Sequence, residues 1–343
     1  MSIEGVDLAV LTGWMDGRGL GEGPIENPVR LAGGTQNILL KFTRAGRSYV
    51  LRRPPPHLRD NSNETMRREA RVLGAIRDTT VPHPRLIAAE PDETVLGAAF
   101  YLMEPIDGFN PTTGLEPLHA GSPDIRHRMG LALVEGIAGL GALDYRALGL
   151  EGLGKPDNYL ERQVARWKAQ LASYGEFPDW TGPGEIPGVE RVAAWLEAHR
   201  PASFEAGIIH GDYHLANVMY RHDSGELAAI VDWELTTIGD PLLDLGWLLA
   251  TWPLGDDPDA GTVSVRPWRG FPTATELVGH YRPRTHRDLS AIAWYGVLAC
   301  YKLGIILEGS HARASAGKAP KEIGDRLHAQ TVSLFERALG WIR

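Results

Sequence analysis

Cysteine is nearly absent from this sequence, which has one such residue among 343. Cys300 stands inside an apolar run, so the chain can form no internal disulfide, and we expect the thiol to be a small buried hydrophobe. Basic residues are missing at the start, where M-S-I-E-G-V-D carries acids instead of the positive charge of a secretion signal. These absences favour a cytoplasmic protein.

Long apolar runs are also scarce. The most membrane-like stretch, residues 289–307, contains Lys302, Ser290 and three aromatic residues, and we find no second such stretch. We therefore expect a buried core helix here and no association with a membrane.

An excess of positive charge is lacking, since the formal net charge is −8. No general attraction to nucleic acid or to an anionic membrane is expected. The charge is uneven, however: residues 41–77 contain ten Lys and Arg against three Asp and Glu, and residues 205–260 contain one Arg against eleven acids. This asymmetry suits a cleft that holds polyphosphate on one side and metal ions on the other, although separately solvated faces would look alike.

Apolar residues make up 43% of the chain, which is ample for a sizeable core in one large domain or two. The periodicity predicts several strands, several helices and two irregular segments, and no internal repeats are found. The strands are expected at 29–31, 38–43, 48–52, 85–88 and 99–103, the helices at 3–15, 62–76, 124–143, 157–173, 189–199, 289–307 and 323–339, a long loop at 253–272, and a mobile polar segment at 308–320.

The most informative stretch is residues 208–234. It contains His210-Gly211-Asp212, then Asn217 five positions after the Asp, then two apolar runs separated by a polar turn, and finally Asp232-Trp233-Glu234. The pattern predicts a loop, a β-hairpin and a second loop. Closing the hairpin would bring Asp212, Asn217 and Asp232 to one end of it.

Three oxygen-bearing side chains gathered in this way suit Mg²⁺, which takes one or two carboxylates and completes its shell with water and phosphate. Asn217 and Asp232 are the natural ligands, and Asp212 is then free to accept a proton from a hydroxyl. Two simpler interpretations are less favoured. His210 and His214 lack the Glu that a zinc-protease motif requires after its first His, and the joint spacing argues against Asp residues that merely occupy turns.

This stretch resembles the phosphotransferase family that is named for the aminoglycoside kinases and includes choline-kinase-like enzymes. Within it, the chain is most similar to kinase-like domains fused to some acyl-CoA dehydrogenases. The resemblance implies an α+β, two-lobed, protein-kinase-like fold. A small antiparallel sheet with one main helix would form the N-terminal nucleotide-binding lobe, residues 1–104. A larger, mainly helical lobe, residues 105–343, would hold the catalytic and substrate sites.

The resemblance also assigns phosphate-binding residues in the N-terminal lobe. The loop Gly33, Gly34, Thr35, Gln36 and Asn37 matches the shortened phosphate loop of the family, although a plain hairpin would fit the same residues. Arg52 stands where the family has a phosphate-binding Lys, with Arg53 as the alternative if the register slips by one. Glu69 matches the Glu that pairs with this basic residue. Because Arg is planar and bulkier than Lys, the replacement is not neutral.

In the segment between the lobes, the resemblance implies that Glu104 and Ile106 bind adenine through their main chains and that Met103 lines the adenine pocket. Further along, Asp240 is expected to cap a helix, and Asp244 to brace the catalytic loop.

The implied reaction moves the γ-phosphoryl group of ATP, or of GTP, to a hydroxyl of a small molecule, with Mg²⁺ as cofactor and Asp212 as the catalytic base. The acceptor stays open between a cationic aminoglycoside and a hydroxyacyl compound or its CoA ester. A catalytically idle nucleotide-binding or scaffolding protein is the alternative, prompted by Arg52. A protein kinase is disfavoured, because no A-P-E segment is present and Asp232 is followed by Trp-Glu. The oligomeric state cannot be inferred from these patterns.

Overall fold

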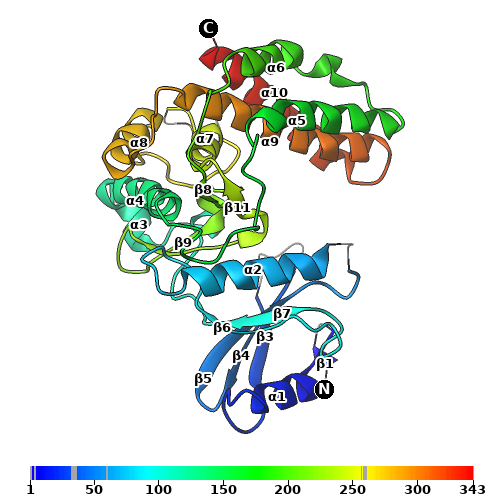
Figure 1. Cartoon of the computed structure of the whole chain (residues 1–343), viewed down its shortest axis with the longest axis vertical. Helices are drawn as coiled ribbons and strands as arrows, with labels where there is room; N and C mark the ends of the chain where they lie inside the picture. Colours follow the sequence, from blue (N-terminus) through cyan, green and yellow to red (C-terminus); the bar gives the residue numbers. More distant parts are fainter. Residues whose placement is uncertain are drawn as a thin grey trace.

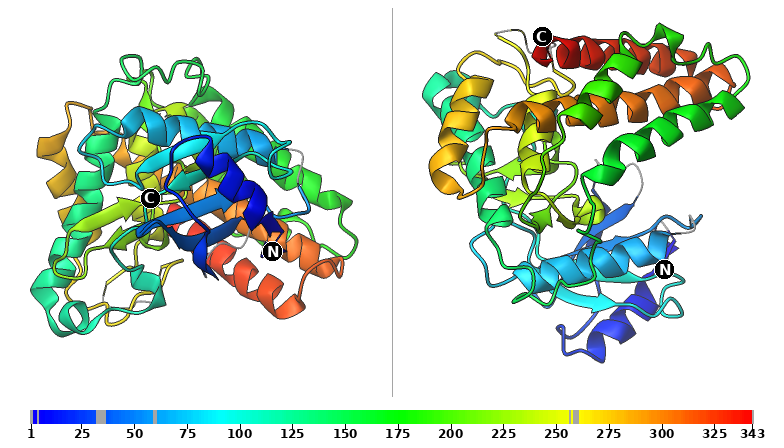
Figure 2. Two further views of the ribbon diagram at one scale, coloured as in Figure 1. Left: turned by 90° about the horizontal axis from the view of Figure 1, so that it is seen from below. Right: turned by 45° about the horizontal axis from the view of Figure 1, so that its top comes forward.

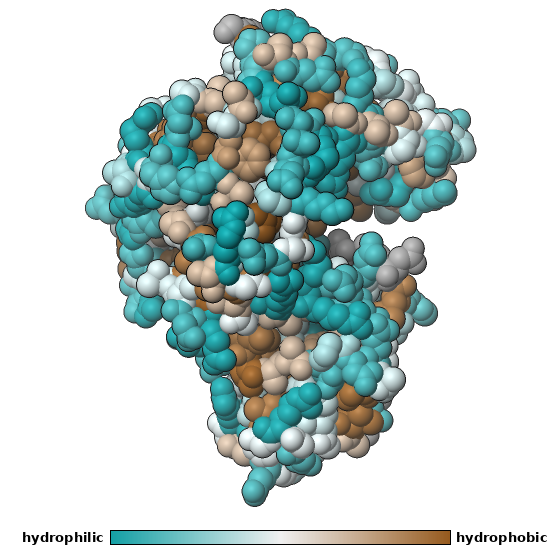
Figure 3. Space-filling model, in the orientation of Figure 1, coloured by the Kyte–Doolittle hydropathy of each residue, from teal (hydrophilic) through white to brown (hydrophobic). Residues whose placement is uncertain are grey.

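The computed structural model describes residues 2–3, 5–31, 37–58, 61–255, 257 and 261–342. Gly33, Gly34, Thr35 and Gln36 of the expected phosphate loop lie outside these residues. The described chain forms a smaller N-lobe built on a sheet and a larger C-lobe made mainly of helices (Figure 1). The surface has a deep notch between the C-lobe helices and the N-lobe (Figure 3).

The N-lobe sheet contains five antiparallel strands among the described residues, in the order β3-β4-β5-β7-β6. A tight turn at Ala45-Gly46, where both residues have positive φ, joins the second strand to the third. The strands confirm the expected positions with shifts of a few residues. They are β3 (Glu26–Arg30), β4 (Ile38–Arg44), β5 (Arg47–Arg53), β6 (Leu86–Glu90) and β7 (Phe100–Met103).

The two faces of the sheet have different partners, because successive side chains of a strand point to opposite faces. Leu40, Leu51 and Leu102 are paired across the strands and pack under α1 (Leu8–Asp16). The expectation of a helix from residue 3 was wrong: short strands β1 (Ser2–Ile3) and β2 (Val6–Asp7) come first. The carboxylate of Asp7 accepts hydrogen bonds from the amides of residues 9 and 10 and so begins the helix.

The opposite face of the sheet turns toward α2 (Ser62–Ile76), whose bounds confirm the expected helix. Met66, Ala70 and Leu73 are buried along one side of this helix, as its 3.6-residue period requires. Glu69 is buried on the same helix, which places a carboxylate inside the lobe rather than on its surface.

The C-lobe surrounds two short pairs of strands. Strands β9 (Val218–Tyr220) and β10 (Leu227–Ile230) form the expected hairpin, and β8 (Gly207–Ile209) pairs with β11 (Thr237–Gly239) on either side of it in the sequence. The helices around them are α3 (Pro117–Gly121), α4 (Pro123–Gly141), α5 (Glu161–Ser173), α6 (Val189–Ala198), α7 (Leu242–Thr251), α8 (Ala274–Tyr281), α9 (Ile292–Ser315) and α10 (Lys321–Trp341).

Helix α9 includes the apolar stretch expected to be a core helix. Its length and composition would allow it to cross a membrane, but 67% of its most apolar window is buried inside the protein. It lies beside α10 and also contacts α5 and α7 (Figure 2). The expectation of a mobile segment at 308–320 was wrong for its first half, because α9 continues to Ser315 with Glu308 and Ala312 buried.

Candidate active site

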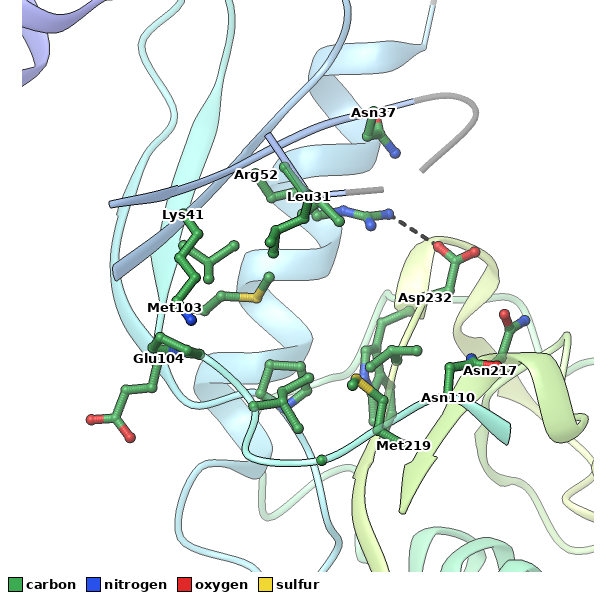
Figure 4. A pocket seen from close by; sticks show the side chains of 18 of the residues that line it. Leu31, Asn37, Lys41, Arg52, Met103, Glu104, Asn110, Asn217, Met219 and Asp232 are labelled. Carbon is green, nitrogen blue, oxygen red and sulfur yellow. Dashed lines mark hydrogen bonds and ion pairs between the residues drawn. The ribbon is translucent and has the colours of Figure 1, made fainter. Parts of the chain in front are cut away.

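A cavity of about 640 Å³ lies between the lobes, and we call it the interlobe cavity. Lys41, Met103 and Glu104 lie on its N-lobe side, and Asn110, Asn217 and Asp232 on its C-lobe side (Figure 4). The volume is in the range usual for small-molecule sites. Of the residues expected from the sequence, it collects Asn37, Arg52, Met103, Glu104, Ile106, Asn217 and Asp232.

Arg52 joins three parts of the fold. Its Nε and Nη2 donate to the two carboxylate oxygens of Glu69 at 2.9 and 2.8 Å, and Nη2 also contacts Oδ1 of Asp232 at 3.0 Å. The strand register explains why Arg53 does not take this position. Arg53 is on the opposite face of the sheet, where it donates to the carbonyl oxygens of Gly5 and of Leu96.

The neighbouring carboxylates keep the side chain of Arg52 positively charged. Burial opposes the charge, but the carboxylates of Glu69 and Asp232 raise the pKa of Arg52 above its ordinary value. The hydroxyl of Tyr101 donates at 3.0 Å to Oε2 of Glu69, the oxygen that also accepts from Arg52 Nε, and so helps to fix the carboxylate. The cleft therefore contains a permanent cation that is held by a rigid, bidentate pair.

The loop that carries Asp212 is held from below by Asp244 on α7. The two carboxylate oxygens of Asp244 accept from the amides of His210 at 2.7 Å and Gly211 at 2.9 Å. Gly211 has φ +89°, and a Cβ there would lie 2.7 Å from the carbonyl oxygen of Leu235, so only glycine fits. The expected bracing role of Asp244 is thus seen directly. Asp240 accepts from the amide of residue 242, although the cap position itself is Pro241, one residue later than expected.

Asp212 is fixed by two neighbours. His214 lies with Nε2 3.2 Å from Oδ1, and the Asn217 amide donates to Oδ2 at 3.0 Å and to the Asp212 carbonyl at 2.9 Å. Burial opposes ionisation, but the hydrogen bond from His214 and the positive charge of Lys302 lower the pKa of Asp212 to about 2. Asp212 is therefore a carboxylate at neutral pH, with both oxygens aimed by hydrogen bonds.

His210 is buried, and its Nε2 contacts the carbonyl oxygen of Val231 at 2.9 Å. The contact connects the loops that precede and follow the hairpin. It gives His210 a structural role in place of the role of a metal ligand.

Asn217 and Asp232 suit a hard cation. Because the Asn217 Nδ2 donates to two oxygens of Asp212, its Oδ1 must point the other way. Asp232 has a left-handed backbone, with φ 67° and ψ 61°, a strained conformation that is common at functional sites. One carboxylate oxygen each from Glu69, Asp232 and Glu234 lies within 4.8 Å of the others. Burial and the nearby Asp232 raise the pKa of Glu234. The sequence analysis included Glu234 in the motif Asp232-Trp233-Glu234 but did not choose it as a site residue.

The segment between the lobes offers main-chain groups. The Glu104 amide donates to the Arg85 carbonyl at 2.9 Å, so Glu104 can offer a ligand only its carbonyl oxygen. Its side chain points away from the cavity and pairs with Arg47 at 3.0 Å (Figure 4).

Lys41 was missed in the sequence analysis. The alternation of β4 places it on the cavity face, which period-two counting could have shown.

A second cavity, of about 480 Å³, lies in the C-lobe with Asp212 in its lining, and we call it the helical cavity. Sequence reasoning did not find it, because its walls come from segments far apart in the chain. The residues that line it are Asp212, His214, Trp247, Thr251, Thr262, Val263, Leu303, Leu307, Arg326, Leu327 and Gln330.

Lys302 on α9 lies behind the catalytic loop. Its Nζ donates to the Gly211 carbonyl at 3.3 Å and lies 4.4 Å from the centre of the Trp247 ring. Burial lowers the pKa of Lys302 to about 8, although Asp212 and Asp244 oppose this shift.

Comparison with known proteins agrees with this geometry. Residues 29–271 match the family described as "Phosphotransferase enzyme family". The chain belongs to this APH family. The solved structure of a "putative aminoglycoside phosphotransferase" from Ralstonia eutropha JMP134 superposes with a TM-score of 0.80 at 28% identity, covering 98% of this chain and 99% of that one. A GDP complex of an aminoglycoside 2′-phosphotransferase of type IIIa has the same fold, with a TM-score of 0.63 at 16% identity over 97% of this chain and 98% of that one.

Curated relatives of the chain are larger proteins. The chain is 30% identical over 298 residues to acyl-CoA dehydrogenase family member 11 of Homo sapiens, covering 84% of this chain and 36% of that protein. It is 27% identical over 317 residues to acyl-CoA dehydrogenase family member 10 of Mus musculus, covering 89% of this chain and 28% of that protein. The chain thus spans about a third of the length of these relatives. Its family membership and its kinase-like fold are those of phosphotransferases.

Proposed function

We propose that the protein transfers the γ-phosphoryl group of ATP, or of GTP, to a hydroxyl of a small molecule. The observation that carries this proposal is the Asn217–Asp212 hydrogen bond. Asn217 lines the interlobe cavity and Asp212 lines the helical cavity. A donor in the first cavity and an acceptor in the second would therefore meet at one pair of hydrogen-bonded side chains, as in-line phosphoryl transfer needs.

Each residue has a role in this proposal. Asp212, ionised and aimed by His214, orients the acceptor hydroxyl and takes its proton. Arg52, held by Glu69, faces the phosphates. Asp232 and the Oδ1 of Asn217 would hold Mg²⁺, which supplies neutralisation of phosphate charge when bound. The carbonyl of Glu104 and the main chain of Ile106 would bind the base, beside Met103.

The helical cavity bears on the acceptor. Asp212 is the one acid among its described lining residues, Arg326 is a cation, and four of the others are leucine or valine. This lining suits a neutral or anionic acceptor with an aliphatic part better than a polycationic aminoglycoside. The names of the curated relatives point the same way, so we propose a hydroxyacyl compound or its CoA ester.

Calorimetric titration with ATP, with and without Mg²⁺, tests the donor side on wild type and on Asp232→Ala. We expect binding that needs Mg²⁺ and is lost in the variant, because Asp232 supplies the carboxylate of the metal site. GTP is titrated in the same series. Turnover is then measured with hydroxyacyl-CoA esters and with an aminoglycoside as acceptors. Absence of Mg²⁺-dependent nucleotide binding would refute the proposal.

An idle nucleotide-binding protein is the second candidate, and one observation favours it. The Arg52 guanidinium already contacts Oδ1 of Asp232, so one oxygen of the carboxylate proposed to hold Mg²⁺ is engaged within the chain. The two candidates differ in one outcome: an idle protein would bind Mg·ATP without transferring phosphate to any hydroxyl or to water.

A further inference from the structure

The wall of the helical cavity includes two polar groups without partners. The indole Nε1 of Trp247 and the hydroxyl of Thr262 are buried, and neither has a hydrogen-bond partner among the described residues. Both residues line this cavity. A buried donor without a partner is destabilising, so such groups are rare and call for a hydrogen-bond acceptor from outside the chain.

A neighbouring threonine gives a direct comparison. Thr251 lines the same cavity, but its hydroxyl contacts the carbonyl oxygens of Trp247 at 2.9 Å and Leu248 at 3.1 Å. The fold therefore satisfies one cavity hydroxyl internally and leaves the other unpaired. This contrast indicates that the hydroxyl of Thr262, like the indole N–H of Trp247, is available to bond a ligand in the cavity.

The position of Trp247 is well fixed. It lies on α7, three residues after the Asp244 that braces the catalytic loop, and its ring is under the ammonium of Lys302. A cation over an indole face holds the ring in place. Trp247 is 5% exposed and its Nε1 is buried, so the indole N–H would act in a water-poor environment, where a hydrogen bond is stronger.

We infer that Trp247 and Thr262 are specificity-determining residues that donate hydrogen bonds to a carbonyl oxygen near the reacting hydroxyl of the acceptor. The inference rests on the proposed phosphotransfer at Asp212, which lines the same cavity. Leu303, Leu307 and Leu327 give the apolar wall for the rest of an acyl chain. Arg326, exposed on α10, faces any anionic group at the far end.

The experiment compares two acceptors on the full chain: a hydroxyacyl-CoA thioester and the matching thioether, which lacks the carbonyl oxygen. The variants are Trp247→Phe and Thr262→Val, with Thr251→Val as the matched control. We expect each test variant to lose about 5- to 10-fold in kcat/KM with the thioester and to change little with the thioether, since one hydrogen bond is lost. The control should not discriminate between the acceptors.

Stability gives a second readout. Because the Thr262 hydroxyl has no partner among the described residues, Thr262→Val should not lower the melting temperature, whereas a structural role would. Trp247→Phe is judged by the kinetic comparison alone, since this change also removes part of a buried ring that lies under Lys302. Equal losses with both acceptors, or no loss with the thioester, would overturn the inference while Mg·ATP binding stays intact. A wild type that binds no Mg·ATP would instead overturn the proposed function and this inference with it.

Discussion

Single side chains of this protein are positioned by hydrogen bonds that differ from those expected of ordinary loop residues. Asp212 has each carboxylate oxygen aimed by a separate partner, one from His214 and one from Asn217. A turn or cap aspartate would instead accept from amides of its own turn. The chemistry at Asp212 can therefore be tested without removing a structural element.

Replacing Asp212 with Asn should lower kcat by about 10²–10⁴-fold, because the amide keeps the shape of the side chain but cannot accept the hydroxyl proton. Nucleotide affinity should be nearly unchanged, since Asp232 and Arg52 remain. Steady-state kinetics and calorimetry measure the two quantities. Asp223→Asn, in the exposed turn of the hairpin, is the control. Near-normal turnover in Asp212→Asn would remove Asp212 from the catalytic role.

Lys302 links pH to stability. Its pKa is about 8 in the folded chain against 10.5 for an ordinary lysine, so between these values the unfolded state binds more protons than the folded state. The unfolding free energy should therefore rise with pH over this window, by up to about 1.4 kcal/mol per pH unit. Below about pH 8 both states are protonated and this contribution is constant.

In Lys302→Met this rise should disappear. The unfolding free energy of the wild type minus that of the variant should therefore increase from pH 8 to pH 10. Urea unfolding at several pH values measures it. Lys318→Met, which changes an exposed lysine of the same lobe, is the control. Parallel pH profiles for wild type and Lys302→Met would show that Lys302 is not the group that titrates.

At the scale of elements, α2 is fastened to the C-lobe as well as to the sheet. Arg68 donates to the carbonyl oxygens of Leu153 at 2.9 Å and Thr236 at 3.1 Å, which both belong to the C-lobe. Arg71 makes similar bonds to Gly149 and Glu151. These contacts hold the helix that carries Glu69 close to the Asp232 segment.

Arg68→Met should therefore raise KM for ATP by about 5-fold, the effect of roughly 1 kcal/mol of lost coupling between the lobes. Arg67→Met is the matched control, because Arg67 is on the same helix but contacts Pro91 and Glu93 within the N-lobe. Kinetics at varied ATP concentration measure both variants. An equal rise in KM for the control would mean that helix stability, and not lobe coupling, is what matters.

Elements were easier to predict from the sequence than cavities. The hairpin that joins Asn217 to Asp232 was visible, because turn residues and two apolar runs are local signals. The choice between Arg52 and Arg53 needed the strand register, which depends on pairing with β4 and β7. The short helix α8 was missed, although the Thr273 side chain and Glu276 form a capping box at its start.

The helical cavity could not be predicted because its walls come from the catalytic loop, α7, α9, α10 and the segment around Thr262, which only tertiary packing brings together. The end of α9 was misjudged for the same reason. Its polar residues after Leu307 look mobile in isolation, but Glu308 is buried and bonds Trp180 and His328. Burial of a paired charge is a property of the fold and leaves no periodic signal.

At the scale of the whole molecule, Arg52 contributes to stability and to function, and the two contributions can be tested separately. It holds the buried carboxylate of Glu69 in the N-lobe and also reaches Asp232 in the C-lobe. Arg52→Met should lower the unfolding free energy by about 3–5 kcal/mol, because it leaves Glu69 buried without its cation. Denaturant unfolding measures this loss.

The double variant Arg52→Met/Glu69→Met should recover most of that stability, since an apolar pair of similar volume can replace a buried ion pair at little cost. It should not recover phosphotransfer, because no cation would remain at that position to face the phosphates. A double variant that regains turnover would show that Arg52 serves the fold alone. One that regains stability but lacks the turnover of the wild type would show that the ion pair is kept for chemistry at the lobe interface and not for stability.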